Sequence, residues 1–182
     1  SHRFVDQSDD FATWVIFWGP TGGEGFTGTS TGFAWLVVPP VRLVTDSFVL
    51  EPLAPRHNER DHAAWMSSID HIHCTPGFRP EDWGGDTWPY EMSADANLGD
   101  LDQHADEFAR GVAFAYTVLE PATGEVIGCV YVDPDETGEA NAQCRLWVRA
   151  DRADLDGELY VTVRAWLDSP AWPFTSVRFP AR

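Results

Sequence analysis

Residues 112–148 read VAFAYTVLEP ATGEVIGCVY VDPDETGEAN AQCRLWV and contain three apolar runs, at 112–119, 126–133 and 142–148. The runs are rich in β-branched and aromatic side chains, which favour strands. The segments between them, 121–124 and 134–138, each begin with Pro and end with Gly, a composition typical of tight turns. We therefore expect three consecutive strands, each pairing antiparallel with the next.

Helical patterns flank these strands. Before them, Pro55 begins a predicted helix, and a second helix over 95–110 ends at Gly111. A loop rich in Pro, Gly and Trp over 74–90 separates the two, and a third helix follows the strands and ends at Pro170. The residues at helical spacing are His62, Trp65, Met66 and Ile69 in the first helix, Leu98, Leu101, Ala105 and Phe108 in the second, and Leu155, Leu159, Val163, Trp166 and Leu167 in the third.

Two short strands complete the expected sheet. One, at 48–53, precedes the first helix, and the other, at 175–179, follows the third. A strand that is joined to its predecessor through a helix pairs with it in parallel. The sequence therefore predicts an α/β (α+β) domain over 46–182, in which helices flank a mixed, mostly antiparallel central sheet.

Residues 1–45 form a separate N-terminal extension in this interpretation. Two aromatic-rich runs, at 11–18 and 33–38, flank a stretch rich in Gly, Thr and Ser and are predicted to be strands. The stretch contains no Lys and no Gly-Lys-Ser/Thr ending, so it lacks the groups of a phosphate-binding loop. We hypothesise that the two strands cover sheet surface, either within one chain or by exchange in a homodimer.

The charge of the chain argues against two classes of partner. With 29 acidic and 12 basic side chains among 182 residues, the formal net charge is -17, which disfavours binding to nucleic acid and to anionic membrane surfaces.

The cysteines are odd in number in a chain long enough to form a core without disulfides, so we expect free thiols and a cytoplasmic location. The apolar runs are too short to span a bilayer, and we expect no export signal.

The order of these elements resembles the core of the GNAT superfamily of acyl-CoA-dependent N-acyltransferases. Three segments carry the likeness: FVLEPL at 48–53 is similar to the family's opening strand, EVIGCVY at 125–131 to its third strand, and LWVRADR at 146–152 to its cofactor segment. The resemblance covers 46–182. It implies that an acyl group, acetyl in the simplest case, is transferred from acyl-CoA to a primary amine of a small-molecule or peptide acceptor, by direct attack in a ternary complex.

The resemblance also implies where acyl-CoA binds. In GNAT proteins, main-chain groups at the end of the fourth strand bind the pantetheine arm, and the N-terminus of the next helix binds the pyrophosphate. The cofactor-binding positions implied here are Trp147, Val148, Arg149, Arg152, Ala153 and Gly157.

The pyrophosphate loop departs from the family pattern. That pattern is Arg or Gln, two residues, Gly, one residue, then Gly or Ala, whereas 152–157 reads RADLDG, with Leu155 at the first Gly position. Asp154 and Asp156 lie beside it, and Asp151 or Asp154 can also cap the helix and occupy its N–H groups. A carboxylate about 6 Å from a phosphate charge costs roughly 3 kcal/mol at an effective dielectric constant near 20, whereas a helix N-terminus contributes about 0.3–1 kcal/mol.

Two functional hypotheses follow from this loop. In the first, the basic cluster of Arg145, Arg149 and Arg152 helps to bind the polyphosphate, and the domain is an acyltransferase. In the second, these arginines pair with neighbouring Asp residues, and the domain is a degenerate GNAT-fold binding or interaction module that does not bind acyl-CoA.

His71, His73 and Cys74 place three metal-binding or nucleophilic groups within four residues. In an extended segment the two His side chains project to the same side. A zinc site needs further ligands, and no second Cys or His pair at ligand spacing supplies them. We therefore expect no metal, and metal-dependent hydrolysis is the least supported hypothesis.

By the resemblance, the segment from residue 71 to 90 shapes the acceptor site. An amine could be caged there through cation–π and charge contacts by Trp83, Trp88, Tyr90 and Glu91. The alternative is that the three aromatic side chains pack in the core. An acceptor ammonium must also lose a proton before it attacks. The candidate general bases, chosen by position alone, are Glu91, His71 and His73.

Overall fold

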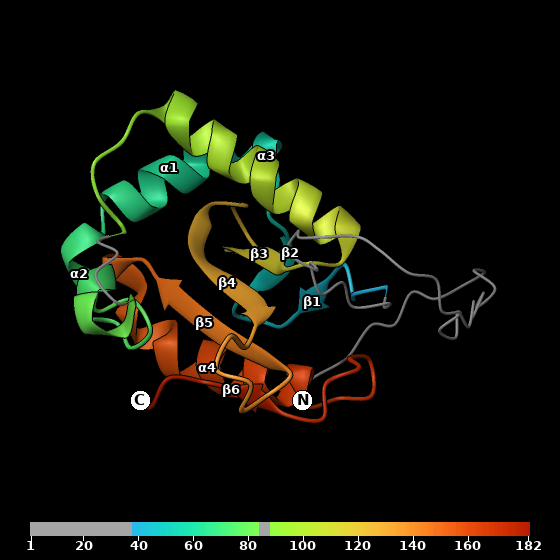
Figure 1. The fold of residues 1–182 in the computed structure, drawn as a ribbon. Helices are drawn as coiled ribbons and strands as arrows, with labels where there is room; N and C mark the ends of the chain where they lie inside the picture. The colour runs from blue at the N-terminus through green and yellow to red at the C-terminus, as the bar shows by residue number, and fades with distance from the viewer. Residues whose placement is uncertain (1–37, 84–87) are drawn as a thin grey trace, which may run out of the picture.

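The computed structural model of the protein describes residues 38–83 and 88–182, which form one six-stranded sheet with the strands in chain order (Figure 1). All neighbouring strands pair antiparallel except the last two, which are parallel. The strands are β1 (Leu43–Val44), β2 (Val49–Pro52), β3 (Phe114–Leu119), β4 (Val126–Pro134), β5 (Ala142–Val148) and β6 (Val177–Arg178). This confirms the predicted mixed, mostly antiparallel sheet, to which the unpredicted β1 adds a short edge strand.

The predicted N-terminal strands lie outside the described residues. The run at 11–18 and residues 33–37 of the second run belong to that part of the chain, and so does the proposed exchange in a homodimer.

A glycine allows β4 and β5 to approach each other closely. Gly128 on β4 pairs with Val148 on β5, and a Cβ atom at position 128 would collide with the main-chain oxygen of Trp147. The mid-strand Gly is therefore a packing requirement of this strand pair.

The helices are η1 (Pro55–His57), α1 (Asn58–Met66), α2 (Ile69–Cys74), η2 (Pro80–Trp83), α3 (Ala94–Arg110), η3 (Ala150–Leu155) and α4 (Asp156–Leu167). The second predicted helix is confirmed as α3. Its N-cap Ser93 accepts a hydrogen bond from the Ala96 N–H at 3.1 Å, and Gly111 ends it in the left-handed conformation with φ of 66°.

The first predicted helix is interrupted, and His71 and His73 lie in the helix α2, so the geometry of an extended segment does not apply to them. Ser67 and Ser68 end α1, and the Ser67 hydroxyl donates to the Ala64 carbonyl at 2.8 Å. Serine side chains compete with helical main-chain bonds in this way. The chain then starts α2, because Ile69 and Ile72 are spaced to pack on the same core.

The third predicted helix begins as the 3-10 turn η3 before it becomes α4. Neither Asp151 nor Asp154 caps it, because the N-cap positions are Arg149 for η3 and Leu155 for α4, and neither makes a side-chain capping bond. The Ala150 N–H instead donates to the hydroxyl of Ser68 at 3.0 Å. The start of this helix is thereby tied to the end of α1.

Two apolar layers hold the sheet between its helices (Figure 1). Side chains alternate across β4 and β5, so that Val130 and Leu146 face α4 whereas Tyr131 and Trp147 face α1 and α3. Asp133 and Arg145 share this second face by the same alternation. Among the described residues, no helix is long and apolar enough to cross a bilayer.

Candidate functional site

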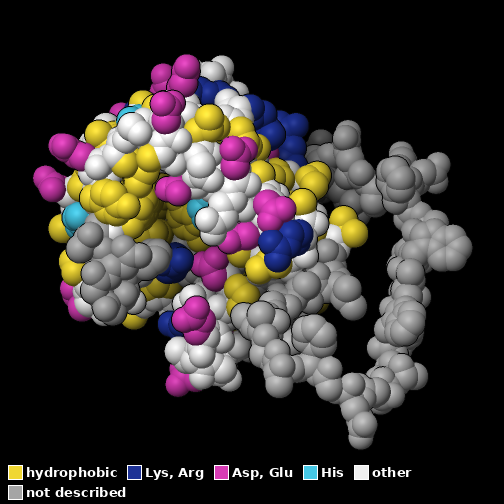
Figure 2. Space-filling view, turned by 45° about the horizontal axis from the view of Figure 1, so that its top comes forward, with side chains coloured by type: hydrophobic (Ala, Val, Ile, Leu, Met, Phe, Trp, Pro, Cys, Tyr) yellow, Lys and Arg dark blue, Asp and Glu magenta, His cyan; other side chains and the backbone are white. Residues whose placement is uncertain are grey.

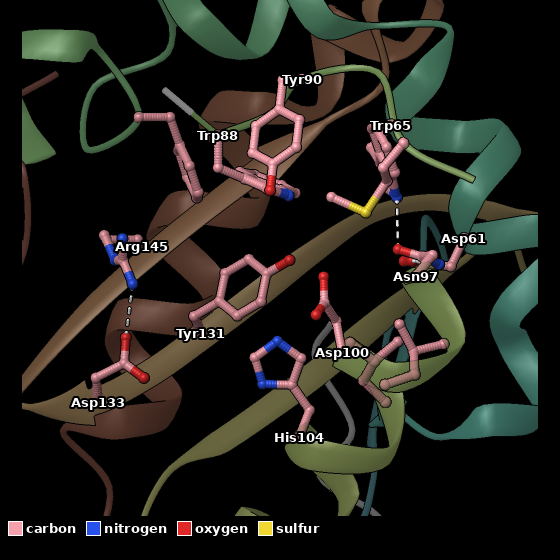
Figure 3. Close-up of a pocket in the computed structure, with 14 residues that line it drawn as sticks. Asp61, Trp65, Trp88, Tyr90, Asn97, Asp100, His104, Tyr131, Asp133 and Arg145 are labelled. Carbon is pink, nitrogen blue, oxygen red and sulfur yellow. Dashed lines mark hydrogen bonds and ion pairs between the residues drawn. The ribbon is translucent and has the colours of Figure 1, made fainter. Parts of the chain in front are cut away.

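A cavity of about 250 Å³ lies between the sheet and helices α1 and α3. Figure 2 shows a hollow on this side of the molecule, with hydrophobic walls and with acidic and His side chains beside it. We call this space the first cavity. The strand residues that reach it are Tyr131 and Asp133 from β4 and Arg145 from β5, and Figure 3 shows them opposite the residues of α1 and α3.

Aromatic rings form one side of the first cavity. Trp88 lies at the centre of these rings, with its ring centroid 6.1 Å from that of Trp65, 5.7 Å from that of Phe78 and 6.3 Å from that of Tyr131. Tyr90 adds a half-exposed ring. Such rings can contact the body of an organic ligand and, through their faces, a cation.

The segment that carries Trp88 and Tyr90 is held to α1 by two hydrogen bonds. The Nε2 atom of His62 donates to the Met92 carbonyl at 2.7 Å, and the Nδ2 atom of Asn58 donates to the Ala94 carbonyl at 2.9 Å. The second anchor lies at the first residue of α3.

A buried carboxyl group faces the first cavity from α1. Asp61 is 3% exposed and accepts a hydrogen bond from Asn97 Nδ2 at 3.1 Å. Asn97 is held in turn by Trp65, whose indole N–H donates to Asn97 Oδ1 at 3.0 Å (Figure 3). Burial raises the pKa of Asp61 to about 6, although the Asn97 bond opposes the shift. Within the described residues Asp61 joins no ion pair, so this carboxyl group can take up either a proton or a cation near neutral pH.

Two side chains of α3 face Tyr131 across the first cavity. Asp100 and His104 are four residues apart and therefore lie on one face of the helix. The His104 and Tyr131 ring centroids are 5.6 Å apart, and Figure 3 shows the Tyr131 hydroxyl and the Asp100 carboxylate pointing into the same space. Burial raises the pKa of Tyr131 well above its usual value, so its hydroxyl stays neutral and can donate a hydrogen bond.

An ion pair closes the far wall. Arg145 Nη2 lies 2.9 Å from Asp133 Oδ2, and the guanidinium carbon lies 5.6 Å from the centroid of the Phe78 ring (Figure 3). Among the described residues, Arg145 is the only Lys or Arg that lines the first cavity, and it is paired with Asp133. The other two carboxyl groups of the lining belong to Asp61 and Asp100.

The candidate bases named from the sequence meet elsewhere. Glu91, His71 and His73 line a second cavity of about 650 Å³ between α2 and residues 89–91, which also reaches Ala150. Tyr90 borders both cavities. Of the expected amine cage, Trp88 and Tyr90 line the first cavity, Glu91 lines the second, and the side chain of Trp83 lies outside the described part of the structure.

The expected cofactor segment runs from the end of β5 into η3 and α4. Trp147 and Val148 are fully buried, on opposite faces of the sheet. Ala153 and Gly157 are exposed, and a Cβ atom at position 157 would meet nothing within 4 Å. A close approach to the main chain is therefore possible at Gly157.

Both arginines of this segment have carboxylate partners. Arg149 Nη2 lies 2.6 Å from Asp151 Oδ2, which lowers the pKa of Asp151, and Arg149 Nη1 lies 3.6 Å from Glu125. Arg152 Nη2 lies 3.2 Å from both carboxylate oxygens of Glu120. A bound polyphosphate would have to displace these carboxylates.

The strands β5 and β6 separate after a short paired stretch. Only Ala142 and Gln143 of β5 pair with β6 in the described structure. Beyond them, Arg182 Nη2 donates to the Leu146 carbonyl at 3.0 Å, and Arg182 Nη1 pairs with Asp156 at the start of α4. The outer edge of β5 past Gln143 is thus contacted by a side chain where a strand would otherwise pair.

The cysteines and the His residues form no metal site among the described residues, where no group of three or more His, Cys, Asp or Glu side chains could hold an ion. Cys129 and Cys144 are buried free thiols, and Cys74 is an exposed one.

Sequence reasoning missed the polar residues of the first cavity. These are Asp61, Asn97, Asp100, His104, Tyr131 and Asp133. One signal was present, because the four-residue spacings of Asp61 with Trp65 and of Asp100 with His104 put each pair on one helix face. The contact between Asp61 and Asn97 joins residues 36 positions apart, which periodicity does not reveal.

Solved structures similar to this chain are acetyltransferases. The ribosomal-protein-S5-alanine acetyltransferase from Vibrio fischeri matches with a TM-score of 0.51 at 12% identity, covering 71% of this chain and 67% of that one. RimL, a ribosomal L7/L12 alpha-N-protein acetyltransferase solved with coenzyme A, matches with 0.51 at 14%, covering 73% and 69%. The microcin C7 self-immunity acetyltransferase MccE, solved with acetyl-CoA and AMP, matches with 0.54 at 12%, covering 75% and 72%.

Comparison with family models and with curated protein sequences gives no match. The structural likeness, at these low identities, establishes the fold: the described chain has the GNAT fold, as predicted.

Proposed function

We propose that this GNAT-fold chain transfers an acyl group, acetyl in the simplest case, from acyl-CoA to a primary amine bound in the first cavity. The observation that carries the proposal is the relation between β5 and that cavity. Past Gln143 the outer main-chain edge of β5 has no strand partner among the described residues, while Arg145 of the same strand lines the first cavity. An acyl carrier lying along this edge would bring its thioester close to an amine in the cavity.

The reaction we propose is a direct attack in a ternary complex. The acceptor ammonium loses one proton, and its nitrogen then forms a bond to the thioester carbonyl carbon as the C–S bond breaks. The thiolate leaves with the electrons of that bond and receives the second proton of the amine nitrogen. Holding the two reactants together supplies most of the rate, and a general base adds about two to four orders of magnitude.

Two locations offer a base for the first proton. Asp61 lies in the first cavity, and burial raises its pKa to about 6, close to the value that suits a base at neutral pH. Glu91, His71 and His73 line the second cavity and remain candidates there. The neutral hydroxyl of Tyr131 is a hydrogen-bond donor that can stabilise the departing thiolate.

On the cofactor side, we propose that main-chain groups of Trp147 and Val148 bind the pantetheine arm. The pyrophosphate would then contact the turn that follows, at Arg149, Arg152, Ala153 and Gly157. Arg149 and Arg152 would exchange carboxylates for phosphate. Partly exposed ion pairs are worth about 0–1 kcal/mol each, so this exchange costs little.

A second candidate function is a GNAT-fold binding module that does not take acyl-CoA. The contacts of Arg182 with Leu146 and Asp156 favour it, because they occupy the β5 edge and the start of α4. The pairing of Arg149 and Arg152 with carboxylates favours it as well.

Titration with acetyl-CoA, followed by thermal unfolding and by calorimetry, separates the two functions. A ligand at about a hundred times its dissociation constant stabilises the fold by about 2.7 kcal/mol. Arg152→Glu should abolish this stabilisation. Arg110→Glu makes an equal change of charge at the last residue of α3, outside the proposed cofactor segment, and should retain the stabilisation. No stabilisation of the unmodified protein at millimolar acetyl-CoA would favour the binding module.

We also propose a cytoplasmic location, which the free thiols support.

A further inference from the structure

We propose that the acceptor of the first cavity is a small organic amine with an apolar body, bound as a cation with its ammonium group at Asp61 and Asp100. This inference rests on the proposed function and deepens it, because it names the class of acceptor.

The first cavity has an excess of negative charge. Of its carboxylates, Asp133 is paired with Arg145, whereas neither Asp61 nor Asp100 joins an ion pair with any described residue. Asp100 also acts on Asp61 through its charge and favours the protonated form there. A cation between these two carboxyl groups would relieve that repulsion and stabilise both as carboxylates.

The aromatic walls suit the remainder of such a ligand. Trp88 contacts the rings of Trp65, Phe78 and Tyr131, so a ligand seated among them would bury its apolar surface against ring faces and edges. An ammonium near these faces would gain cation–π attraction as well. An anionic ligand would meet the same ring faces and two unbalanced carboxylates, and would be repelled by both.

The hydrogen-bonding groups around Asp61 fit an ammonium better than a peptide carbonyl group. Carboxylates only accept hydrogen bonds, and an ammonium only donates them. The two amide hydrogens of Asn97 are already used by Asp61 and Asn58. Peptide carbonyl groups, which need donors, would therefore find few near Asp61.

The volume sets an upper size. A cavity of roughly 150 Å³ accommodates benzene, and the first cavity measures about 250 Å³. It therefore has room for one aryl ring or short alkyl chain and a few further atoms that carry the ammonium group.

Binding of 2-phenylethylamine tests the inference, with 3-phenylpropionate and 2-phenylethanol as anionic and neutral analogues and a short peptide with a free α-amino group as the fourth ligand. Binding is measured by calorimetry on the whole chain, with and without coenzyme A. We expect the amine to bind at least about tenfold more tightly than the other three, because the anionic and neutral analogues have no ammonium group to pair with Asp61 and Asp100, and the carbonyl groups of the peptide find few donors near Asp61.

Variants then locate the ammonium. Asp61→Asn and Asp100→Asn should each weaken amine binding about tenfold or more, and Asp102→Asn, an exposed neighbour on α3 outside the cavity, should leave it unchanged. Asp100 is exposed, so its variant tests the site even if Asp61→Asn folds poorly. Equal binding of all four ligands, preference for the peptide, or full amine binding in both cavity variants would overturn the inference.

The acetyl-CoA titration separates this inference from the proposed function. If acetyl-CoA stabilises the protein but the amine does not bind, the acceptor class is wrong and the proposed transfer stands. If neither ligand binds, both proposals fail.

Discussion

The guanidinium of Arg182 donates a hydrogen bond to the main-chain carbonyl of Leu146 at 3.0 Å and so covers the outer edge of β5. The same side chain pairs with Asp156 and lies with its guanidinium carbon 5.1 Å from the Tyr160 ring centroid. In the proposed function this edge receives the pantetheine arm, so Arg182 and acyl-CoA compete for one site.

We therefore predict that Arg182→Ala binds acetyl-CoA more tightly than the unmodified protein. The hydrogen bond from Arg182 to Leu146 must break before acetyl-CoA binds, and such a bond is worth about 0.5–1.5 kcal/mol. Its removal therefore corresponds to a gain of about two- to tenfold in the affinity for acetyl-CoA. Calorimetric titration measures it, with Arg164→Ala on the same side of the fold as the control. Weaker binding by Arg182→Ala would mean that Arg182 contacts the cofactor.

The buried Asp61 makes stability depend on pH in a defined direction. Burial raises its pKa from 3.8 to about 6, so the folded state keeps a proton that the unfolded state loses first. The free energy of unfolding attributable to this group therefore falls as pH rises from about 4 to 6, by about 3 kcal/mol in total.

Asp61→Asn removes that titration. We predict that its stability relative to the unmodified protein increases by about 3 kcal/mol between about pH 3.5 and pH 7, as measured by urea unfolding at both values. Asp102→Asn, at an exposed position, should show no such trend. If the difference in the free energy of unfolding between Asp61→Asn and the unmodified protein did not change with pH, the Asp61 carboxyl group would not be buried as described.

Activity against pH distinguishes the two possible locations of the base. If Asp61 accepts the proton, it must be ionised, and kcat/KM rises with pH through about 6 and then levels off. Asp61→Asn should then lower kcat by about a hundredfold or more and remove the rise. Glu91→Gln and His73→Gln serve as the matched variants in the second cavity. A large loss of kcat in those variants, with normal activity of Asp61→Asn, would assign the base to the second cavity.

Close packing of β4 and β5 gives a prediction about stability. Gly128→Ala adds a Cβ atom that collides with the Trp147 main-chain oxygen, so we expect a loss of about 1–3 kcal/mol in the free energy of unfolding. Gly157→Ala, in α4 with open space around it, should raise that free energy by about 0.5–1 kcal/mol. Chemical denaturation of both variants measures the contrast, and an unchanged Gly128→Ala protein would contradict the packing described.

Elements governed by local chemistry could be predicted from the sequence. Gly111 ends α3 because it adopts a positive φ, and the Pro-to-Gly segments at 121–124 and 134–138 separate strands that pair antiparallel. The parallel pairing of β6 follows from its connection through α4. The interruption by Ser67 and Ser68 was missed, because it depends on a side-chain bond to the main chain and on packing of Ile72.

The first cavity could not be predicted, because its polar groups gain their properties from distant partners. The carboxyl group of Asp61 on α1 accepts a hydrogen bond from Asn97 on α3, and the ring of Tyr131 on β4 faces that of His104 on α3. The contact of Arg182 with Leu146 spans 36 residues and follows from the separation of β5 from β6. The candidate bases Glu91, His71 and His73 do come together, but in a second cavity whose shape depends on α2 being helical.

Acyl transfer itself is tested most directly by incubating the protein with acetyl-CoA and 2-phenylethylamine, with product detected by mass spectrometry and free thiol measured in the same mixture. We predict N-acetylated amine and free coenzyme A in equal amounts, with both greatly reduced in Arg152→Glu. Absence of acetylated product and of thiol release with this amine and with a broad panel of other amines would contradict the proposal that this GNAT fold is an acyltransferase.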